Sequence, residues 1–178
     1  FDSPPAAAAR AFIAAQGGTP AATLAGTGIQ TSAPLAAFGN ATALRYLDFN
    51  DAYSRRDASH PSGNLPALLA VGEAEGRSGK ALIAALVAAY EVQMRLCDYA
   101  GDPSLKKRGW HLSCNLALST AAGAAKLLTD DPAITAQAIA ISALHQNTLA
   151  AVQFGRISMM KATTDAWVAK GGIEAALL

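Results

Sequence analysis

The residues able to move protons or hold anions are few in this chain, and most stand at predicted helix ends or in loops. Functional side chains concentrate at such positions because a rigid scaffold can present them there. The candidates are Asp48 and Asp51 in "LDFNDAY", His60, Ser62 and Gly63 in "SHPSGN", His111 in "RGWHLS", and Arg156 and Lys161 in "GRISMMKA". Together they predict a site for acid–base chemistry on an anion.

His60 stands in "DASHPSGNLPALLAV", directly before an apolar run. A histidine beside a polar turn is more often an ordinary surface residue than a catalytic one. If it belongs to a site, Pro61 stiffens the approach and Gly63 lets the backbone come near a ligand. The amides of Ser62 and Gly63 would then receive an anion at a helix N-terminus. Both interpretations stay open on these residues alone.

The other candidates also have a structural alternative. Asp48 and Asp51 lie three residues apart and could share a helical face, or be solvated carboxylates at a fraying helix end. Lys161 is predicted in the first turn of a helix, where the helix dipole disfavours a cation. This unfavourable placement indicates a functional role for the lysine. His145, predicted inside a helix, is interpreted as a packed or solvated residue outside the site.

Several site classes are excluded by spacing. The three histidines show no i, i+4 pair and have no cysteine pair beside them, so no metal site is expected. No G-x-S-x-G motif is present, and the glycines of residues 17–28 do not join a strand to a helix as a phosphate loop would. What remains is a cofactor-free acid–base site in which Lys161 and Arg156 hold carboxylates. The predicted reaction is proton abstraction beside a carboxylate, followed by loss of a leaving group.

Composition restricts the partners. The 178 residues carry 14 Lys and Arg against 13 Asp and Glu, and a net charge of +1 suggests neither a nucleic-acid nor a membrane partner. The longest wholly apolar stretch, residues 81–90, is far shorter than the roughly 20 residues that cross a bilayer. Cys97 and Cys114 form no C-x-x-C pair and are interpreted as reduced core residues. With no cationic leader at its start, the chain is expected to be cytoplasmic.

The pattern predicts one all-α domain over residues 1–178, a bundle of about seven helices with at most a short hairpin near the N-terminus. Ser3, Ser78 and Asp131 are predicted helix caps. The expected helices span residues 4–16, 34–47, 65–75, 81–100, 113–128, 132–152 and 158–178, and the apolar start of 81–100 predicts the central buried helix. The Ala-rich helices and abrupt ends predict part of a larger, self-associating protein.

Four blocks, in order, resemble one known family. They are "RYLDFNDAY", "SHPSGNLPALLAVGEAEGRSGKALIAALVAAYEVQMRLCD", "RGWH" followed by "AAGAAKLL", and "GRISMMKATTDAWVAKGGIEAALL". Together they are similar to the helical domain of the MmgE/PrpD family, with a pattern nearest its 2-methylcitrate dehydratase branch. The resemblance covers the chain from about Thr19 onward.

The resemblance implies an all-α domain that is followed in full-length members by a smaller α+β lid, absent here, and usually forms a homodimer. It also implies a polycarboxylate substrate and neither metal nor organic cofactor. The family's motifs fall on Asp48, His60, His111 and Lys161, which are therefore the expected catalytic residues. Asp51, Ser62, Gly63 and Arg156 are the expected substrate-binding residues.

This chain departs from the family pattern at three places: Ala52 stands where Thr is common, Met160 where Trp is common, and His111 lacks the Asp that often precedes it. Loss of the hydroxyl at position 52 removes one possible bond to substrate. Three functions remain open. The first is a lyase that dehydrates 2-methylcitrate or a similar tricarboxylate, the second a decarboxylase or epimerase of the same family, and the third a non-catalytic helical remnant that serves in dimer assembly.

Overall fold

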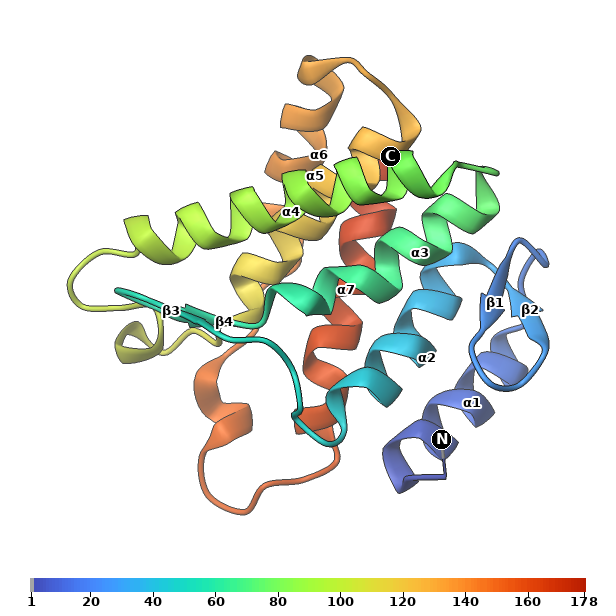
Figure 1. The fold of residues 1–178 in the computed structure, drawn as a ribbon. Coiled ribbons are helices and arrows are strands. Elements are labelled where there is room, and N and C mark those ends of the chain that lie inside the picture. Colours follow the sequence, from blue (N-terminus) through green and yellow to red (C-terminus); the bar gives the residue numbers. More distant parts are fainter. Residues whose placement is uncertain (1) are drawn as a thin grey trace.

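The computed structural model describes residues 2–178, which fold into seven α-helices and two small antiparallel strand pairs (Figure 1). The helices are α1 (Pro4–Gln16), α2 (Ala33–Arg45), α3 (Leu65–Ala74), α4 (Gly79–Tyr99), α5 (Ser113–Leu128), α6 (Pro132–His145) and α7 (Met160–Leu177). The strands are β1 (Ala22–Leu24) with β2 (Ile29–Thr31), and β3 (Tyr53–Ser54) with β4 (Ala58–Ser59). Short 3-10 helices are η1 (Pro61–Asn64), η2 (Lys106–Arg108) and η3 (Ala150–Gln153). The all-α prediction is confirmed, and the structure adds a second strand pair before η1.

The helix starts follow local signals that the sequence carries. The Asp131 carboxylate accepts a hydrogen bond from the Ala133 amide at 2.8 Å, and the Ser78 hydroxyl accepts one from the Ala81 amide at 3.2 Å. Each of these bonds satisfies a backbone donor that has no partner within its helix. Both predicted caps are confirmed. Ser3 occupies the cap position of α1, but its side chain makes no capping bond.

The prediction that residues 81–100 form the central buried helix is wrong. In α4 the buried residues form a single stripe, Ala85, Ala89, Gln93 and Cys97, at intervals of four, and the opposite face is open to solvent. The most buried helix is α5, in which 13 of 16 residues are buried. An apolar sequence does not by itself bury a helix, because burial depends on what packs against each face.

Two predicted helix ends also differ from the structure. The helix expected over residues 132–152 ends at His145, and η3 follows as a separate short element. His145 therefore lies at the exposed end of α6 instead of mid-helix, which agrees with its interpretation as a solvated residue. The last helix begins at Met160, two residues after the predicted start.

Small residues let α7 run through the middle of the bundle, between α2 and α5 (Figure 1). A Cβ atom at Gly172 of α7 would lie 2.9 Å from Cβ of Thr120 and 3.0 Å from the carbonyl oxygen of Ala117, both on α5. Close packing of this kind tolerates no added methyl group without movement of a neighbour. The approach of α5 to α7 holds the site described below at a fixed spacing.

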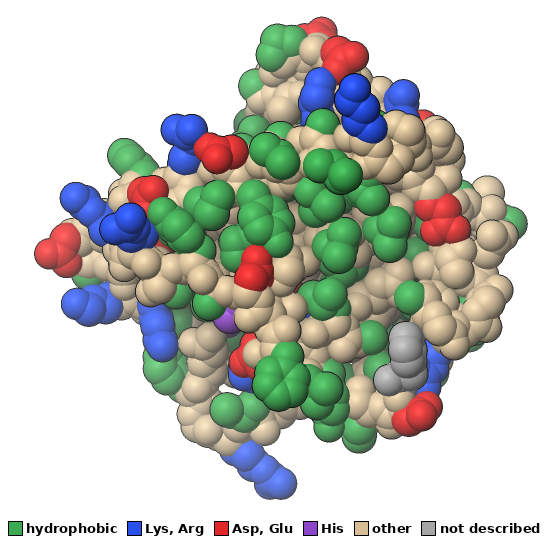
Figure 2. All heavy atoms as spheres, in the orientation of Figure 1, with side chains coloured by type: hydrophobic (Ala, Val, Ile, Leu, Met, Phe, Trp, Pro, Cys, Tyr) green, Lys and Arg blue, Asp and Glu red, His purple; other side chains and the backbone are tan. Residues whose placement is uncertain are grey.

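One face of the molecule is unusually apolar. Figure 2 shows hydrophobic side chains gathered over α3 and α4, where Leu69, Ile83 and Val87 are exposed. Within residues 2–178, no helix has both the length and the hydrophobicity to span a bilayer.

We expect Gly172→Ala to destabilise the fold. A Gly-to-Ala change inside a helix alone would stabilise by roughly 0.5–1 kcal/mol, but here the methyl group meets the backbone of α5, so a net loss of about 1–3 kcal/mol is expected. Gly79→Ala is the control, because nothing lies within 4 Å of its Cβ position. Urea unfolding should show a lower midpoint for the first variant only; equal midpoints would contradict the close approach of α5 and α7.

Candidate active site

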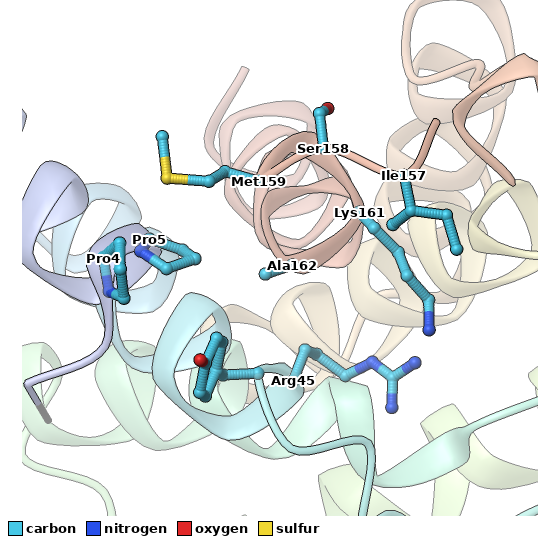
Figure 3. Close-up of a pocket in the computed structure, with 9 residues that line it drawn as sticks. Pro4, Pro5, Arg45, Ile157, Ser158, Met159, Lys161 and Ala162 are labelled. Carbon is cyan, nitrogen blue, oxygen red and sulfur yellow. The ribbon is translucent and has the colours of Figure 1, made fainter. Parts of the chain in front are cut away.

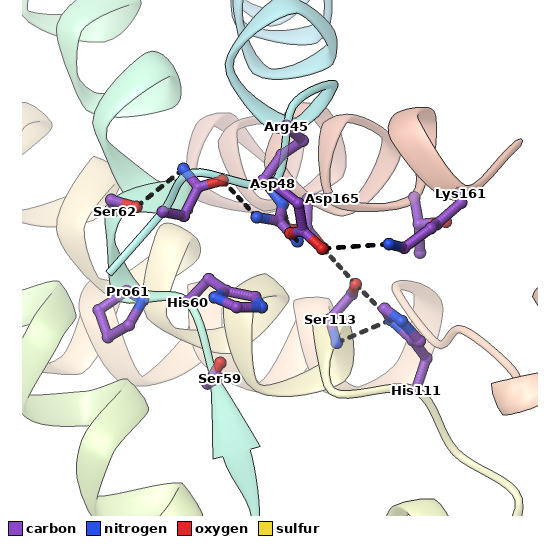
Figure 4. A network of polar contacts seen from close by, with 12 residues as sticks. Arg45, Asp48, Ser59, His60, Pro61, Ser62, His111, Ser113, Lys161 and Asp165 are labelled. Atoms are coloured by element: carbon purple, nitrogen blue, oxygen red, sulfur yellow. Dashed lines mark hydrogen bonds and ion pairs between the residues drawn. The ribbon is translucent and has the colours of Figure 1, made fainter. Parts of the chain in front are cut away.

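The four residues predicted to be catalytic come together where helix ends meet. Asp48 follows the C-terminal end of α2, His60 precedes η1, His111 precedes α5, and Lys161 lies in the first turn of α7. In Figure 4 the rings of His60 and His111 point toward the same region, which Asp48 and Lys161 border. Residues more than 100 positions apart in sequence thus form one polar cluster.

A chain of alternating charges crosses this cluster. The Lys161 ammonium lies 3.1 Å from Asp48 Oδ2, and Asp48 Oδ1 lies 2.8 Å from Nη2 of Arg45. Nε of Arg45 then lies 2.6 Å from Oδ2 of Asp165. The side chains of Arg45 and Asp165 are only 9% and 4% exposed, whereas those of Lys161 and Asp48 are about 40% exposed. The buried Arg45–Asp165 pair fixes this row of charges in the core, and the exposed Lys161–Asp48 pair lies where a ligand can reach it.

The backbone at Asp48 turns its carboxylate toward the two cations. Asp48 has a φ of +57°, the left-handed region that Asp adopts more readily than most residues. Burial tends to raise the pKa of this carboxyl, but the hydrogen bond from Lys161 and the charges of Arg45 and Lys161 outweigh it. The pKa of Asp48 therefore lies below its ordinary value, and the group is a carboxylate at neutral pH.

His111 is buried and held at both ring nitrogens. Nδ1 lies 2.6 Å from the Ser113 hydroxyl, and Nε2 lies 2.7 Å from the side-chain nitrogen of Gln153 in η3. Its backbone amide donates to the Thr148 carbonyl at 2.8 Å. Burial lowers the pKa of His111; the charge of Asp165 opposes this, and that of Arg45 adds to it. His111 is thus a neutral imidazole at neutral pH, which is the form that accepts a proton.

The loop that carries His60 is fixed by Asp51. Nδ1 of His60 lies 2.7 Å from the Asp51 carbonyl oxygen, which can only accept, so Nδ1 carries the hydrogen. The Asp51 carboxylate accepts from the Ser62 amide and from the Tyr90 hydroxyl, both at 2.9 Å. Burial, followed by the bond to Asp51, raises the pKa of Tyr90 to about 12. Asp48 and Asp51 do not share a helical face, because α2 ends at Arg45 and both residues follow it outside any helix.

The expectation that the amides of Ser62 and Gly63 are free to bind an anion is wrong. The Ser62 amide is taken by Asp51, and the Gly63 amide donates to the His60 carbonyl oxygen at 3.0 Å. Gly63 is needed for packing instead, since a Cβ there would lie 3.0 Å from a Leu116 methyl group. The first donors of η1 are thus taken by a side chain from the preceding loop and by the turn itself.

Arg156 does not join the cluster. It lies in the exposed segment between η3 and α7, and within the described residues it forms no ion pair. The buried guanidinium of the site belongs to Arg45 instead. The sequence pattern misses Arg45 because a basic residue in the last turn of a helix is ordinary.

A cavity of about 280 Å³ opens beside the charged chain, between the start of α1, the end of α2 and the start of α7 (Figure 3). Arg45 and Lys161 line it, and their charged ends point to the same side, away from Pro4 and Pro5. The histidines do not line this cavity. A small anion at its charged edge would meet both cations, while the acid–base groups lie beyond Asp48.

Sequence reasoning also missed three polar residues that connect the cluster: Asp165, Ser113 and Gln153. Asp165 lies one helical turn after Lys161, so an i, i+4 pairing could have indicated it. Ser113 follows His111 by two residues, a spacing that carries no such rule. Gln153 comes from η3, whose position no sequence signal gives.

Within residues 2–178, no three His, Cys, Asp or Glu side chains are grouped so as to hold a metal ion. Cys97 and Cys114 are free thiols in the core, as predicted, and burial raises the pKa of both. Both thiols are protonated at neutral pH and take no part in the row of ion pairs from Lys161 to Asp165.

Fold and site together define an all-α domain that gathers histidines, cations and carboxylates where its helix ends meet. The whole chain, residues 1–178, matches the model of the MmgE/PrpD N-terminal domain, and the chain belongs to the MmgE/PrpD family. The resemblance of the sequence blocks to this family is therefore confirmed.

Three curated relatives show what the chain is similar to. It is 30% identical over 151 residues to the cis-aconitate decarboxylase-like protein oryM of Aspergillus oryzae, and this match covers 80% of this chain and 31% of the relative. It is 43% identical over 56 residues to the mitochondrial 2-methylcitrate dehydratase of Yarrowia lipolytica, a match that covers 32% of this chain and 11% of the relative. It is 37% identical over 78 residues to the 2-methylcitrate dehydratase of Cupriavidus necator, a match that covers 38% of this chain and 16% of the relative. The matched regions span less than a third of each relative's length.

We expect stability to fall as the pH drops below about 6.5, the ordinary histidine value, and His111 to account for part of the loss. The lowered pKa means that the unfolded chain binds this proton more readily than the folded protein does. The contribution of His111 to stability is therefore complete above the ordinary value and is lost as the pH falls toward the lowered one.

Urea titrations between about pH 5 and pH 7.5 measure this effect as the slope of unfolding free energy against pH. His111→Asn should give a shallower slope than the unmodified protein. His145→Asn, at the exposed end of α6, is the control and should keep the original slope. A slope unchanged by His111→Asn would contradict the account of His111.

Proposed function

We propose that this domain carries part of the active site of a lyase that removes water from a tricarboxylate such as 2-methylcitrate, by acid–base chemistry without a metal or organic cofactor. The observation that carries the proposal is the convergence of Asp48, His60, His111 and Lys161 on one cluster around a buried arginine. The names of the two 2-methylcitrate dehydratases among its relatives support the choice of substrate.

In this proposal the cations hold the substrate and the histidines move its protons. Lys161, at the edge of the cavity, pairs with one substrate carboxylate, since charge-assisted bonds to carboxylates are strong. Neutralising that carboxylate acidifies the neighbouring C–H bond. The helices α5 and α7 both begin at the cluster, so their positive ends add to the attraction for an anion.

His111 acts as the base and His60 as the acid. Nε2 of His111 takes the proton from the carbon beside the carboxylate, and the C–H electron pair forms the carbon–carbon double bond. The step requires His60 in its imidazolium form, with a hydrogen on each ring nitrogen. The hydroxyl on the adjacent carbon leaves as water with the proton from Nε2 of this imidazolium, and the Nδ1–H of His60 stays on the Asp51 carbonyl. Proton exchange with solvent restores both rings.

The second candidate is decarboxylation of a polycarboxylate such as cis-aconitate. It is favoured by the cis-aconitate decarboxylase-like relative from Aspergillus oryzae, whose match covers 80% of this chain. Both reactions need a cation on one carboxylate and a proton moved at the neighbouring carbon, so the same residues serve either. Assays for water loss and for carbon dioxide release separate the two.

We expect His60→Asn and Lys161→Ala each to lower turnover by about 10² to 10⁴, the usual worth of a positioned acid–base or charge-stabilising group. The assay uses the natural full-length protein with 2-methylcitrate and, separately, cis-aconitate, each with and without EDTA. Lys170→Ala, on the same helix but paired with Glu174, is the control and should keep full turnover. Activity that EDTA abolishes and zinc restores, or unchanged turnover in His60→Asn, would contradict the mechanism.

We also propose that the protein forms a homodimer through the apolar face of α3 and α4. Exposed side chains there, among them Ile83 and Val87, surround a cavity of about 390 Å³. A contiguous apolar patch of this kind is typical of an interface.

Light scattering should therefore find a dimer, and the double variant Ile83→Lys, Val87→Glu should shift the protein to a monomer because charge is buried poorly at an interface. Ile134→Lys places a charge on an exposed apolar position of α6 and should leave the dimer intact. A stable monomer of the unmodified protein at high concentration would contradict the proposal.

A further inference from the structure

A continuous line of hydrogen-bonded side chains leads from Arg45 through Asp165 and Ser113 to His111. Arg45 pairs with Oδ2 of Asp165, and the Ser113 hydroxyl bonds Oδ1 of the same carboxylate. The Ser113 oxygen also lies 2.6 Å from Nδ1 of His111, and Gln153 caps Nε2 at 2.7 Å. Figure 4 shows Ser113 between the carboxylate and the imidazole. Ser113 is fully buried, so no solvent competes for its single hydrogen.

The positions of the hydrogens along this line indicate which ring nitrogen of neutral His111 carries the hydrogen. Asp165, paired with Arg45, is a carboxylate and can only accept, so the hydroxyl hydrogen of Ser113 goes to Asp165. The Ser113 oxygen can then only accept from His111, which requires the hydrogen of the neutral ring on Nδ1. The other tautomer would set two lone pairs against each other at 2.6 Å. The Ser113 amide also points its N–H at Nδ1, at 3.2 Å, and this longer contact favours the opposite tautomer. The 2.6 Å contact between Nδ1 and the Ser113 hydroxyl is the shorter of the two and outweighs it.

The contact at Nε2 agrees with this assignment. A nitrogen without hydrogen accepts, and the side-chain amide nitrogen of Gln153 donates. Gln153 belongs to η3 and its side chain is partly exposed, so a bound ligand can take its place. The lone pair of Nε2 is then directed at the ligand, while Nδ1 stays on Ser113.

We propose that Ser113 is a positioning residue that holds His111 as its Nδ1–H tautomer, so that Nε2 is the basic atom offered to a substrate carbon. This inference rests on the proposed lyase function and adds to it the residue that sets the base. When Nε2 takes the substrate proton, the ring becomes an imidazolium with a hydrogen on each nitrogen. Nδ1–H still donates to Ser113, whose own hydrogen stays on Asp165. The negative charge of Asp165 therefore stabilises the imidazolium without receiving a proton.

The first test is nitrogen-15 NMR of the histidine rings in the full-length protein at neutral pH, which distinguishes a ring nitrogen with hydrogen from one without. We expect Nδ1 of His111 to carry the hydrogen in the unmodified protein and in Ser113→Thr, which keeps a hydroxyl. Ser113→Ala should give a mixture of the two tautomers. Hydrogen on Nε2 in the unmodified protein would overturn the proposal, and this readout needs no substrate.

The second test is the pH profile of kcat/KM on the substrate that the unmodified protein turns over. Ser113→Ala should lose about 10- to 100-fold, the usual cost of removing a group that orients a functional histidine, and Ser113→Thr should recover most of it. The acid limb of the profile should also shift, because the imidazolium has lost its link to Asp165.

Ser119→Ala is the matched control. Ser119 is a fully buried serine on the same helix, and its hydroxyl bonds Asn64 and Gln93 instead of the site. It should cost stability without moving the His111 tautomer or the pH profile. If Ser113→Ala and Ser119→Ala lower turnover equally with unchanged profiles, Ser113 is only structural. If no tricarboxylate is turned over, the lyase proposal fails while the NMR result still decides the tautomer.

Discussion

The ion pair between Arg45 and Asp165 is the interaction on which the site depends. A guanidinium and a carboxylate removed from water need each other, because either charge left alone in the core costs several kcal/mol, about 3–5 in typical cases. The pair joins the last turn of α2 to the second turn of α7. From it, Arg45 extends to Asp48, and Asp165 extends through Ser113 to His111, so one buried contact positions both Asp48 and the proposed base.

The packing of the helix bundle also positions the site, beyond what the Arg45–Asp165 pair does alone. Close approach of α5 to α7, permitted by Gly172, brings Ser113 within reach of Asp165. Because α5 and α7 begin at the cluster, the positive ends of their helix dipoles favour negative charge there, and Lys161 strengthens the same field. An anionic ligand would thus meet a fixed arrangement of positive groups, with the neutral imidazole of His111 alongside.

The sequence predicts the helices and the four motif residues because caps, breakers and short motifs are local signals. It does not predict which helix is buried: α4 is apolar over its first half yet faces solvent, since nothing within the described chain covers that face. It also predicts free anion-binding amides at Ser62 and Gly63, whereas the Asp51 carboxylate and the His60 carbonyl oxygen accept from these two amides. Arg45 and Asp165 are found only in three dimensions, because their pairing joins positions 120 residues apart.

We infer that the Arg45–Asp165 pair serves the chemistry as well as the fold. The most direct measurement compares unfolding free energy and turnover in the double variant Arg45→Met, Asp165→Leu. Apolar residues of similar volume can replace a buried ion pair at little cost, so stability should stay near that of the unmodified protein. Turnover should fall by about 100-fold or more, because Asp48 loses a cation and Ser113 loses its acceptor. A stable double variant with unchanged turnover would contradict the account.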